Sequence, residues 1–312
     1  MAGRRGEWMA VSFEFFRFRF HFRAVTPVRF PPGKAANVIR GGLGLVLRQW
    51  APPAVFAGLF QPEGGRGRTP SGLADPPRPF LIRAAHLDGV EAAAGATFYW
   101  DVHAFDTGHP PLEALRQSFE RLAEEGLGPG RGRAALERVE QVDLLGNARA
   151  AEDSPQALVP LSIDLEGDAP ASSVRLRFVT PTELKGEGGL AERPEFGILF
   201  GRLRDRIGAL SALYGRGPLA VDFRGLGERA RVVRLVGHTL EWQRPERRSG
   251  RTGQVHSIGG FTGDAEYAGD LGEFLPWLAA ARWVGVGRHT VWGNGDVRVV
   301  ASGNPCTPAN PA

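Results

Sequence analysis

Residues 16–23 alternate without exception between phenylalanine and a basic side chain. The phenylalanines, Phe16 to Phe22, fall on one side of this alternation, and the basic residues, Arg17 to Arg23, fall on the other. A period of two predicts a β-strand with one buried and one solvated face. Phe13 and Phe15 are out of phase with the later phenylalanines, which predicts a bulge or kink near Phe15.

The rest of the first half predicts helices and strands in a recurring order. Apolar residues at helical spacing predict a helix over residues 36–50, which Pro52 and Pro53 end. Gly41, Gly42 and Gly44 inside it indicate close packing or the close approach of a ligand. The remaining predicted elements are strands at 54–60, 80–86 and 97–105, a helix at 112–125 and a strand at 136–145. With one of the short strands between the two helices left out of the count, this order is that of a ferredoxin-like βαββαβ unit.

The second half shows the same order after a stretch of little periodicity at residues 146–160, which we interpret as a linker. The predicted elements are a strand at 173–179, a helix at 196–214, strands at 231–242 and 260–267, a helix at 271–281 and a strand at 297–300. We therefore expect an α+β protein with tandem ferredoxin-like (RRM-like) domains, at residues 1–150 and 151–312. The tail from residue 301 is expected to be disordered.

Composition adds a basic character to this picture. Lys34 and Lys185 are the only lysines, so arginine supplies nearly all of the 38 basic side chains. The net charge of +4 and the isoelectric point near 9.8 fit either the composition bias of a GC-rich genome or a polyanionic partner. Cys306 is the only cysteine, which excludes an internal disulfide and a cysteine zinc site. Without an apolar leader or membrane span, the chain is expected to be soluble and cytoplasmic.

A glycine-punctuated segment precedes the last predicted strand. Gly285 and Gly287 are followed after five residues by Gly293 and Gly295. Glycines let a backbone approach a ligand closely, and successive N–H groups can hold a phosphate. The segment lacks the Gly-Lys-Ser/Thr of a phosphate-binding P-loop and the βαβ context of a dinucleotide fingerprint. A glycine-rich hairpin without a ligand remains the alternative. Arg288, His289 and Thr290 would lie at its tip.

A second segment, residues 255–264, follows a run of arginines that includes Arg251. A basic ribbon beside an apolar strand suits a nucleic-acid backbone, although a solvated surface hairpin has the same pattern. No pair of histidines has ligand spacing with a supporting carboxylate, so no metal site is expected.

Together these blocks carry a family resemblance. The segments 259–264, 267–271 and 274–278, followed by the paired Gly-x-Gly loop, resemble the C-terminal signature of the RAMP superfamily. Within it they are most similar to the CRISPR precursor-RNA processing endoribonucleases, the Cas6 family. The match covers roughly the last 60 residues. An early strand at 13–23, a proline-rich turn at 27–32 and Arg40-Gly41-Gly42-Leu43-Gly44 add weaker agreement.

The resemblance implies tandem ferredoxin-like domains and cleavage of CRISPR repeat RNA without a metal ion or cofactor. The 2′-hydroxyl beside the scissile phosphate attacks it, which gives 2′,3′-cyclic phosphate and 5′-hydroxyl ends. This chemistry needs a base, a proton donor and cations. The expected RNA-binding residues are Arg251, Gly285, Gly287, Arg288, His289, Gly293 and Gly295.

This sequence departs from the family at the expected base. Many members carry a histidine on or near the first helix, but none lies between Val25 and Phe80. The candidate catalytic residues are therefore Lys34, Arg40 and His256, with His289 also well placed. An arginine stays protonated and is a poor base.

Three functions stay open at this point. The first is a repeat-specific endoribonuclease that produces guide RNAs (crRNAs). The second is a RAMP protein that binds repeat RNA or crRNA in a complex with other Cas proteins without cutting it. The third is an unrelated ferredoxin-like binding module. Either a monomer or a homodimer is compatible with the sequence, and no membrane partner is expected.

Overall fold

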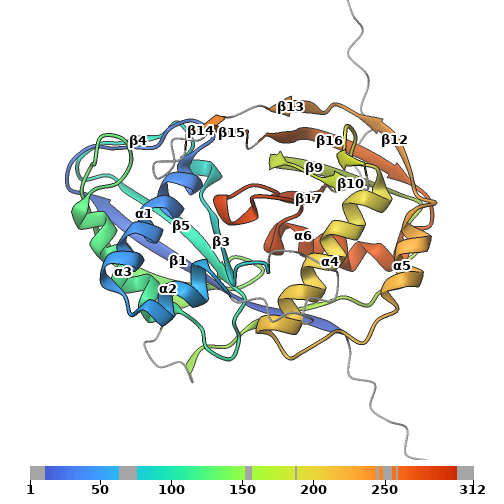
Figure 1. Ribbon diagram of the computed structural model, residues 1–312, viewed down its shortest axis with the longest axis horizontal. Coiled ribbons are helices and arrows are strands. Elements are labelled where there is room, and N and C mark those ends of the chain that lie inside the picture. The colour runs from blue at the N-terminus through green and yellow to red at the C-terminus, as the bar shows by residue number, and fades with distance from the viewer. Residues whose placement is uncertain are drawn as a thin grey trace, which may run out of the picture.

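The computed structural model describes residues 11–62, 76–151, 157–186, 188–243, 246–248, 255–257 and 259–300. Two large β-sheets lie side by side in it, and each carries helices (Figure 1). We refer to the two halves as the first and the second unit.

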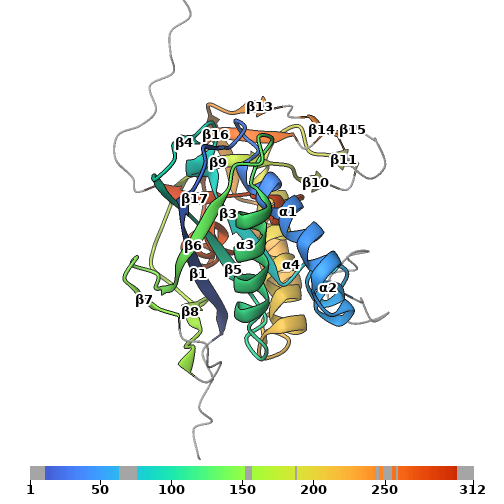
Figure 2. The ribbon, with the colours of Figure 1, turned by 90° about the vertical axis from the view of Figure 1, so that its left-hand side faces the viewer.

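The first unit is built on a sheet in the order β3-β5-β1-β6, with every neighbouring pair antiparallel. Helices α1, α2 and α3 lie on the same side of this sheet (Figure 2). Its principal elements are β1 (Ser12–Ala24), α1 (Ala35–Trp50), α2 (Pro53–Phe60), β3 (Phe80–Arg83), β5 (Thr97–Ala104), α3 (Leu112–Glu125) and β6 (Ala134–Val142). Short strands β2 (Val28–Arg29), β4 (Glu91–Ala92) and β7 (Ala148–Ala150) and a 3₁₀ turn at Ala85–Leu87 complete it.

The second unit repeats the strand order as β12-β16-β9-β17, again antiparallel. Its principal elements are β9 (Ser173–Thr182), α4 (Phe196–Tyr214), α5 (Phe223–Ala230), β12 (Arg234–His238), β13 (Glu241–Gln243), β16 (Gly260–Ala268), α6 (Leu275–Val284) and β17 (Val297–Val300). The smaller elements are β10 (Lys185–Gly186), β11 (Gly189–Leu190), β14 (Glu246–Arg248) and β15 (Val255–Ser257), with 3₁₀ turns at Gly272–Phe274 and Thr290–Trp292. Strand β8 (Leu161–Asp164) pairs antiparallel with the start of β1 and so belongs to the sheet of the first unit.

The expected tandem ferredoxin-like fold is confirmed, because each unit has the βαββαβ chain order and the sheet order of that motif. One predicted element was wrong. Residues 54–60 form helix α2 rather than a strand, with Pro53 in its first turn and Leu59 and Phe60 buried at its end. Proline suits the first turn of a helix, and so short an apolar run has no periodicity that distinguishes helix from strand.

Strand β1 takes part in two hydrophobic cores. Phe16, Phe18, Phe20 and Phe22 are buried in the core of the first unit. Phe15 is buried in the second core with Phe13, and its ring lies 5.7 Å from that of Trp283 on α6. The phase change near Phe15 therefore marks the point where the strand passes from one core to the other. The register shift that β1 shows lies further on, between His21 and Phe22.

The glycines of α1 allow close helix packing. A Cβ on Gly42 would lie 2.5 Å from the Leu122 side chain of α3, and one on Gly44 would lie 2.8 Å from the ring of Phe60. The sequence indicated either close packing or the close approach of a ligand at these glycines. Close packing explains both Gly42 and Gly44. α1 thus sits near its neighbours and holds Arg40 in a fixed place.

His103 is buried where the two units meet. Its Nδ1 lies 2.7 Å from the carbonyl oxygen of Trp283, and its ring packs against those of Phe15 and Trp283. Burial, with the charge of Arg83, lowers the pKa of His103 to about 3. The imidazole is therefore neutral in the folded protein at neutral pH.

We expect His103 to make stability depend on pH. The unfolded chain binds a proton at this residue below its ordinary pKa near 6.5, whereas the folded chain does not until about pH 3. Stability is therefore full above pH 6.5 and falls as the pH drops toward 3, by roughly 5 kcal/mol at most at 1.4 kcal/mol per pKa unit.

The measurement is the free energy of unfolding in denaturant between pH 7 and pH 4. His103→Asn, which keeps a donor for the Trp283 carbonyl, should show a shallower decline than the wild type. His109→Asn, at a side chain 95% exposed, should decline like the wild type. Equal slopes in all three proteins would contradict the assignment.

Candidate functional site

The glycine-rich segment, residues 285–295, forms a loop between α6 and β17. It lies between the two units in the centre of the molecule, where its 3₁₀ turn contacts α1 and β3 (Figure 1). Gly285, Gly287, Gly293 and Gly295 all have positive φ, from 74° to 91°. Side-chain-bearing residues rarely adopt this conformation, so each of the four positions favours glycine.

Packing against the protein itself adds to this constraint. A Cβ on Gly287 would lie 2.3 Å from the carbonyl oxygen of Glu183, and one on Gly293 would lie 2.5 Å from Cβ of Ala36. The N–H groups of Gly285, Gly293 and Gly295 donate to the carbonyls of Ala281, Thr290 and Pro181. These glycines thus shape a rigid loop whose three N–H groups bind carbonyls of the protein itself.

Side chains from both units hold this loop in place. Arg83 on β3 donates to the carbonyls of Gly293 and Arg282, and Thr180 on β9 donates to the carbonyl of Gly293. Because the first unit supplies one anchor and the second unit the other, the loop tip has a defined position relative to both.

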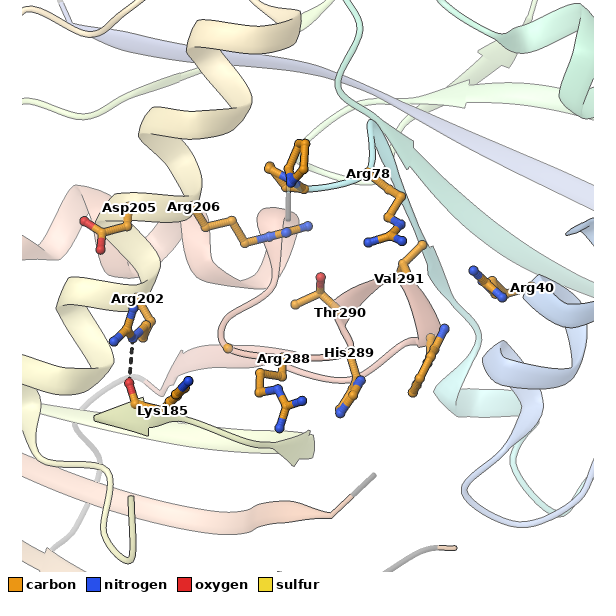
Figure 3. A pocket seen from close by; sticks show the side chains of 14 residues that line it. Arg40, Arg78, Lys185, Arg202, Asp205, Arg206, Arg288, His289, Thr290 and Val291 are labelled. Atoms are coloured by element: carbon orange, nitrogen blue, oxygen red, sulfur yellow. Dashed lines mark hydrogen bonds between the residues drawn. The ribbon is translucent and has the colours of Figure 1, made fainter. Parts of the chain in front are cut away.

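A cavity of about 490 Å³ opens beside the tip of the loop. The first unit contributes α1 and the segment before β3, and the second unit contributes α4, β10 and the loop (Figure 3). Its charged or titratable lining residues are Arg40, Arg78, Lys185, Arg202, Asp205, Arg206, Arg288 and His289.

The cavity is strongly cationic. Asp205 is the only acidic residue among the described residues that line it, and its carboxylate pairs with Arg204 at 2.8 Å. Desolvation, with the nearby charge of Arg83, lowers the pKa of Arg206 to about 9, so this guanidinium stays charged at neutral pH. A concave surface of one charge sign attracts and concentrates ligands of the opposite sign.

Two arginines bring the first unit to the cavity. The guanidinium carbon of Arg40 lies 4.6 Å from the ring centroid of Phe60, a cation–π contact that orients it. Arg78 extends toward the cavity from the segment before β3 (Figure 3). Its Nε is buried and has no hydrogen-bond partner among the described residues. A buried donor of this kind favours an acceptor supplied by a ligand.

At the loop tip, His289 lies in an ordered group of side chains. Its ring stacks on Trp292 with centroids 4.4 Å apart and planes 8° apart. Its Nε2 lies 3.7 Å from Oε1 of Glu183, and the same carboxylate oxygen lies 2.5 Å from Arg288 Nη1. The Glu183 side chain is only 3% exposed.

The structure brings part of the sequence-predicted site together. Arg40, Gly287, Arg288 and His289 line the same cavity, and the other three glycines belong to the same loop. Lys34 is the N-cap of α1 and is not among the described residues lining this cavity. Its neighbours Gly33 and Ala35 line a second cavity of about 890 Å³.

The structure does not describe the side chains of the remaining two sequence candidates, His256 and Arg251. His256 is on β15, opposite Arg247 of β14, and its side chain is not described. Arg251 lies outside the described residues. Their roles stay predictions.

Sequence reasoning missed several residues of the cavity. Arg202 and Arg206 are four residues apart on α4, so they share one helix face, and this spacing could have singled them out. Arg78 lies in Pro77-Arg78-Pro79-Phe80, a segment before a predicted strand that resembles the family but indicated no role for the arginine. Glu183 had no local signal, since its carboxylate meets Arg288 and His289 across a long sequence separation.

Two further properties concern the described part of the chain alone. No group of three or more His, Cys, Asp or Glu residues there could hold a metal ion. None of its helices is long and apolar enough to cross a membrane.

Gly287→Ala should destabilise the loop. The new methyl group would meet the Glu183 carbonyl, and the residue would have to keep a φ of 80°. We expect the free energy of unfolding to fall by about 1–3 kcal/mol. Gly188→Ala is the matched control, because a Cβ there meets nothing within 4 Å. Equal thermal unfolding midpoints for the two variants would show that the loop does not need glycine at residue 287.

Known proteins share both the sequence pattern and the fold. Residues 176–297 match the family model described as CRISPR-associated endoribonuclease Cas6, and residues 13–159 match one described as an N-terminal domain. No curated protein matches the chain.

Solved structures match over almost the whole chain. A Cas6 product complex is 19% identical, with a TM-score of 0.57 over 92% of this chain and 99% of that one. Thermus thermophilus Cas6 is 18% identical, with a TM-score of 0.52 over 93% and 100%. A partial Cas6-RT-Cas1–Cas2 complex is 12% identical, with a TM-score of 0.59 over 93% of this chain and 47% of that one. At these identities the likeness shows a common fold. The family match adds a likeness in sequence to the Cas6 endoribonucleases over residues 176–297, which form most of the second unit.

Proposed function

We propose that the protein binds CRISPR repeat RNA in the cavity between its two units and cuts it there to produce guide RNAs. The observation that carries this proposal is the convergence of cations from both units on one cavity beside the glycine-rich loop. Arg40 and Arg78 come from the first unit, and Arg206 and Arg288 come from the second. The volume of about 490 Å³ lies within the usual range for small-ligand sites and accommodates a nucleotide.

The charge of the cavity suits phosphodiester cleavage by the adjacent 2′-hydroxyl. In this reaction the 2′ oxygen bonds to phosphorus, the bond from phosphorus to O5′ breaks, and the phosphoryl oxygens gain negative charge in the transition state. Fixed cations stabilise that charge more than that of the ground state. Arginine adds paired donors that match phosphate geometry. The route needs no metal ion.

A second candidate function rests on the first helix. No histidine lies between Val25 and Phe80, where many members of this family carry the base. The protein would then hold repeat RNA or guide RNA as a non-catalytic RAMP subunit beside other Cas proteins. A structural neighbour that contains Cas1 and Cas2 makes such partners a reasonable choice for a pull-down experiment.

Cleavage in EDTA separates the two functions. The wild-type protein, incubated with a panel of CRISPR repeat RNAs and excess EDTA, should cut one at a single position and leave 2′,3′-cyclic phosphate and 5′-hydroxyl ends. A 2′-deoxy substitution just 5′ of that position should abolish cutting, since the nucleophile is gone. RNA that is bound tightly but stays intact would favour the non-catalytic subunit.

Arg78→Gln tests the cavity as the RNA site. Loss of a phosphate contact should lower RNA affinity roughly tenfold at moderate salt and reduce the slope of log affinity against log salt by about one. Arg224→Gln is the matched control. Arg224 is 90% exposed on α5 and pairs with Glu228 on the same helix, so its affinity and salt slope should stay at wild-type values. Equal effects of the two substitutions would place the RNA elsewhere.

A further inference from the structure

The backbone of His289 is in an unfavourable conformation. Its φ of 62° lies in the left-handed region, which costs a residue with a side chain about 1 kcal/mol or more. Residues held in this way occur preferentially at functional sites, where the surrounding structure fixes them. Here the flanking glycines and the stacking on Trp292 fix both the backbone and the ring.

The surroundings of His289 suit proton transfer. The ring lines the cationic cavity, and its side chain is 15% exposed, so it is both accessible and held in place. The buried carboxylate of Glu183 faces it at 3.7 Å. A carboxylate beside an imidazole orients the ring and stabilises the imidazolium that forms when the ring accepts a proton.

The other described histidines lie elsewhere. His103 is buried, with its pKa lowered to about 3, and His109 is 95% exposed. His86 stacks on Tyr99 and lines the second cavity. Among the histidines whose side chains the structure describes, His289 is the one that lines the cavity with Arg40, Arg78 and Arg288.

We propose that His289 is the general base of the cleavage reaction and that Glu183 is its positioning residue. This inference rests on the function proposed above. It places the base on the C-terminal loop instead of on the first helix, so the absence of a histidine from α1 is compatible with catalysis.

The step conserves protons and electrons. The imidazole of His289 takes the proton of the 2′-hydroxyl as the 2′ oxygen bonds to phosphorus. The bond from phosphorus to O5′ breaks, O5′ receives a proton from water, and the imidazolium returns its proton to the hydroxide so formed. Arg288 keeps Glu183 in position through their ion pair while the cavity cations stabilise the phosphoryl oxygens.

His289→Gly is the decisive variant. Glycine adopts a φ of 62° without strain, so the loop should keep its shape, and removal of the ring leaves a space between Trp292 and Glu183. Imidazole added to the buffer can enter this space. His289→Asn is the second variant, since asparagine tolerates the left-handed region but does not act as a base.

Cleavage is measured in single turnover with saturating wild-type or variant protein, so that weaker binding does not enter the rate. Both variants should cut the repeat RNA about 100-fold or more slowly than the wild type. Imidazole should restore the His289→Gly rate at least tenfold, and more so as the pH rises through the titration of free imidazole. His109→Gly, at an exposed residue away from the cavity, should cut at the wild-type rate with or without imidazole.

A rate within threefold of the wild type in either variant would overturn the proposed base, as would a loss that imidazole does not restore. A wild-type protein that cuts no repeat RNA would overturn the cleavage proposal itself, and the base with it. The two failures are thus told apart by the wild-type control.

Discussion

The packing of β1 into two hydrophobic cores is the constraint on which the site depends. One strand cannot change direction freely when Phe13 and Phe15 are buried in the second core and the phenylalanines that follow are buried in the first. The relative placement of the two units is therefore set inside the protein rather than by surface contacts. A cavity with one wall from each unit keeps its dimensions only under that condition.

The glycine-rich loop depends on this placement in turn. Its turn packs against α1 and β3, and Arg83 and Thr180 bind the carbonyl of Gly293 from opposite units. A loop anchored on both sides presents Arg288 and His289 at a fixed distance from Arg40 and Arg78. Catalytic charge stabilisation requires such fixed donors, since reorganising them during the reaction would consume the energy that they supply.

Much of the fold was predictable, because period-two and helical patterns report burial directly. The alternation after Phe15 gave β1, and the apolar stripes gave α1, α3 and α4. Helix α2 was mistaken for a strand because its eight residues are apolar almost throughout. In such a run the tertiary packing of Leu59 and Phe60, and not the local pattern, decides the structure.

The candidate site was predictable only in part. Its loop carries a sequence signature, so Gly287, Arg288 and His289 were found. Arg40 was found because it opens the glycine-rich stretch of α1 that resembles the family. Lys185 carries no such signature, and its place at the cavity depends on the way α4, β10 and the loop meet in space. Glu183 carries none either, because its carboxylate meets Arg288 and His289 only in the folded chain. The glycines were expected to approach a ligand, yet the space where their side chains would be is filled by the protein's own atoms.

The positions of this loop also differ in how freely their residues can be substituted. The glycine pairs at either end are each confined by backbone geometry and by neighbouring atoms, so substitution there disturbs the whole loop. The tip between them lines the cavity, and Val291 there has neither a positive φ nor a confined glycine position. On the proposed function, exchange of Val291 would change the surface that meets the RNA and leave this frame intact, much as antibody loops vary on a fixed scaffold.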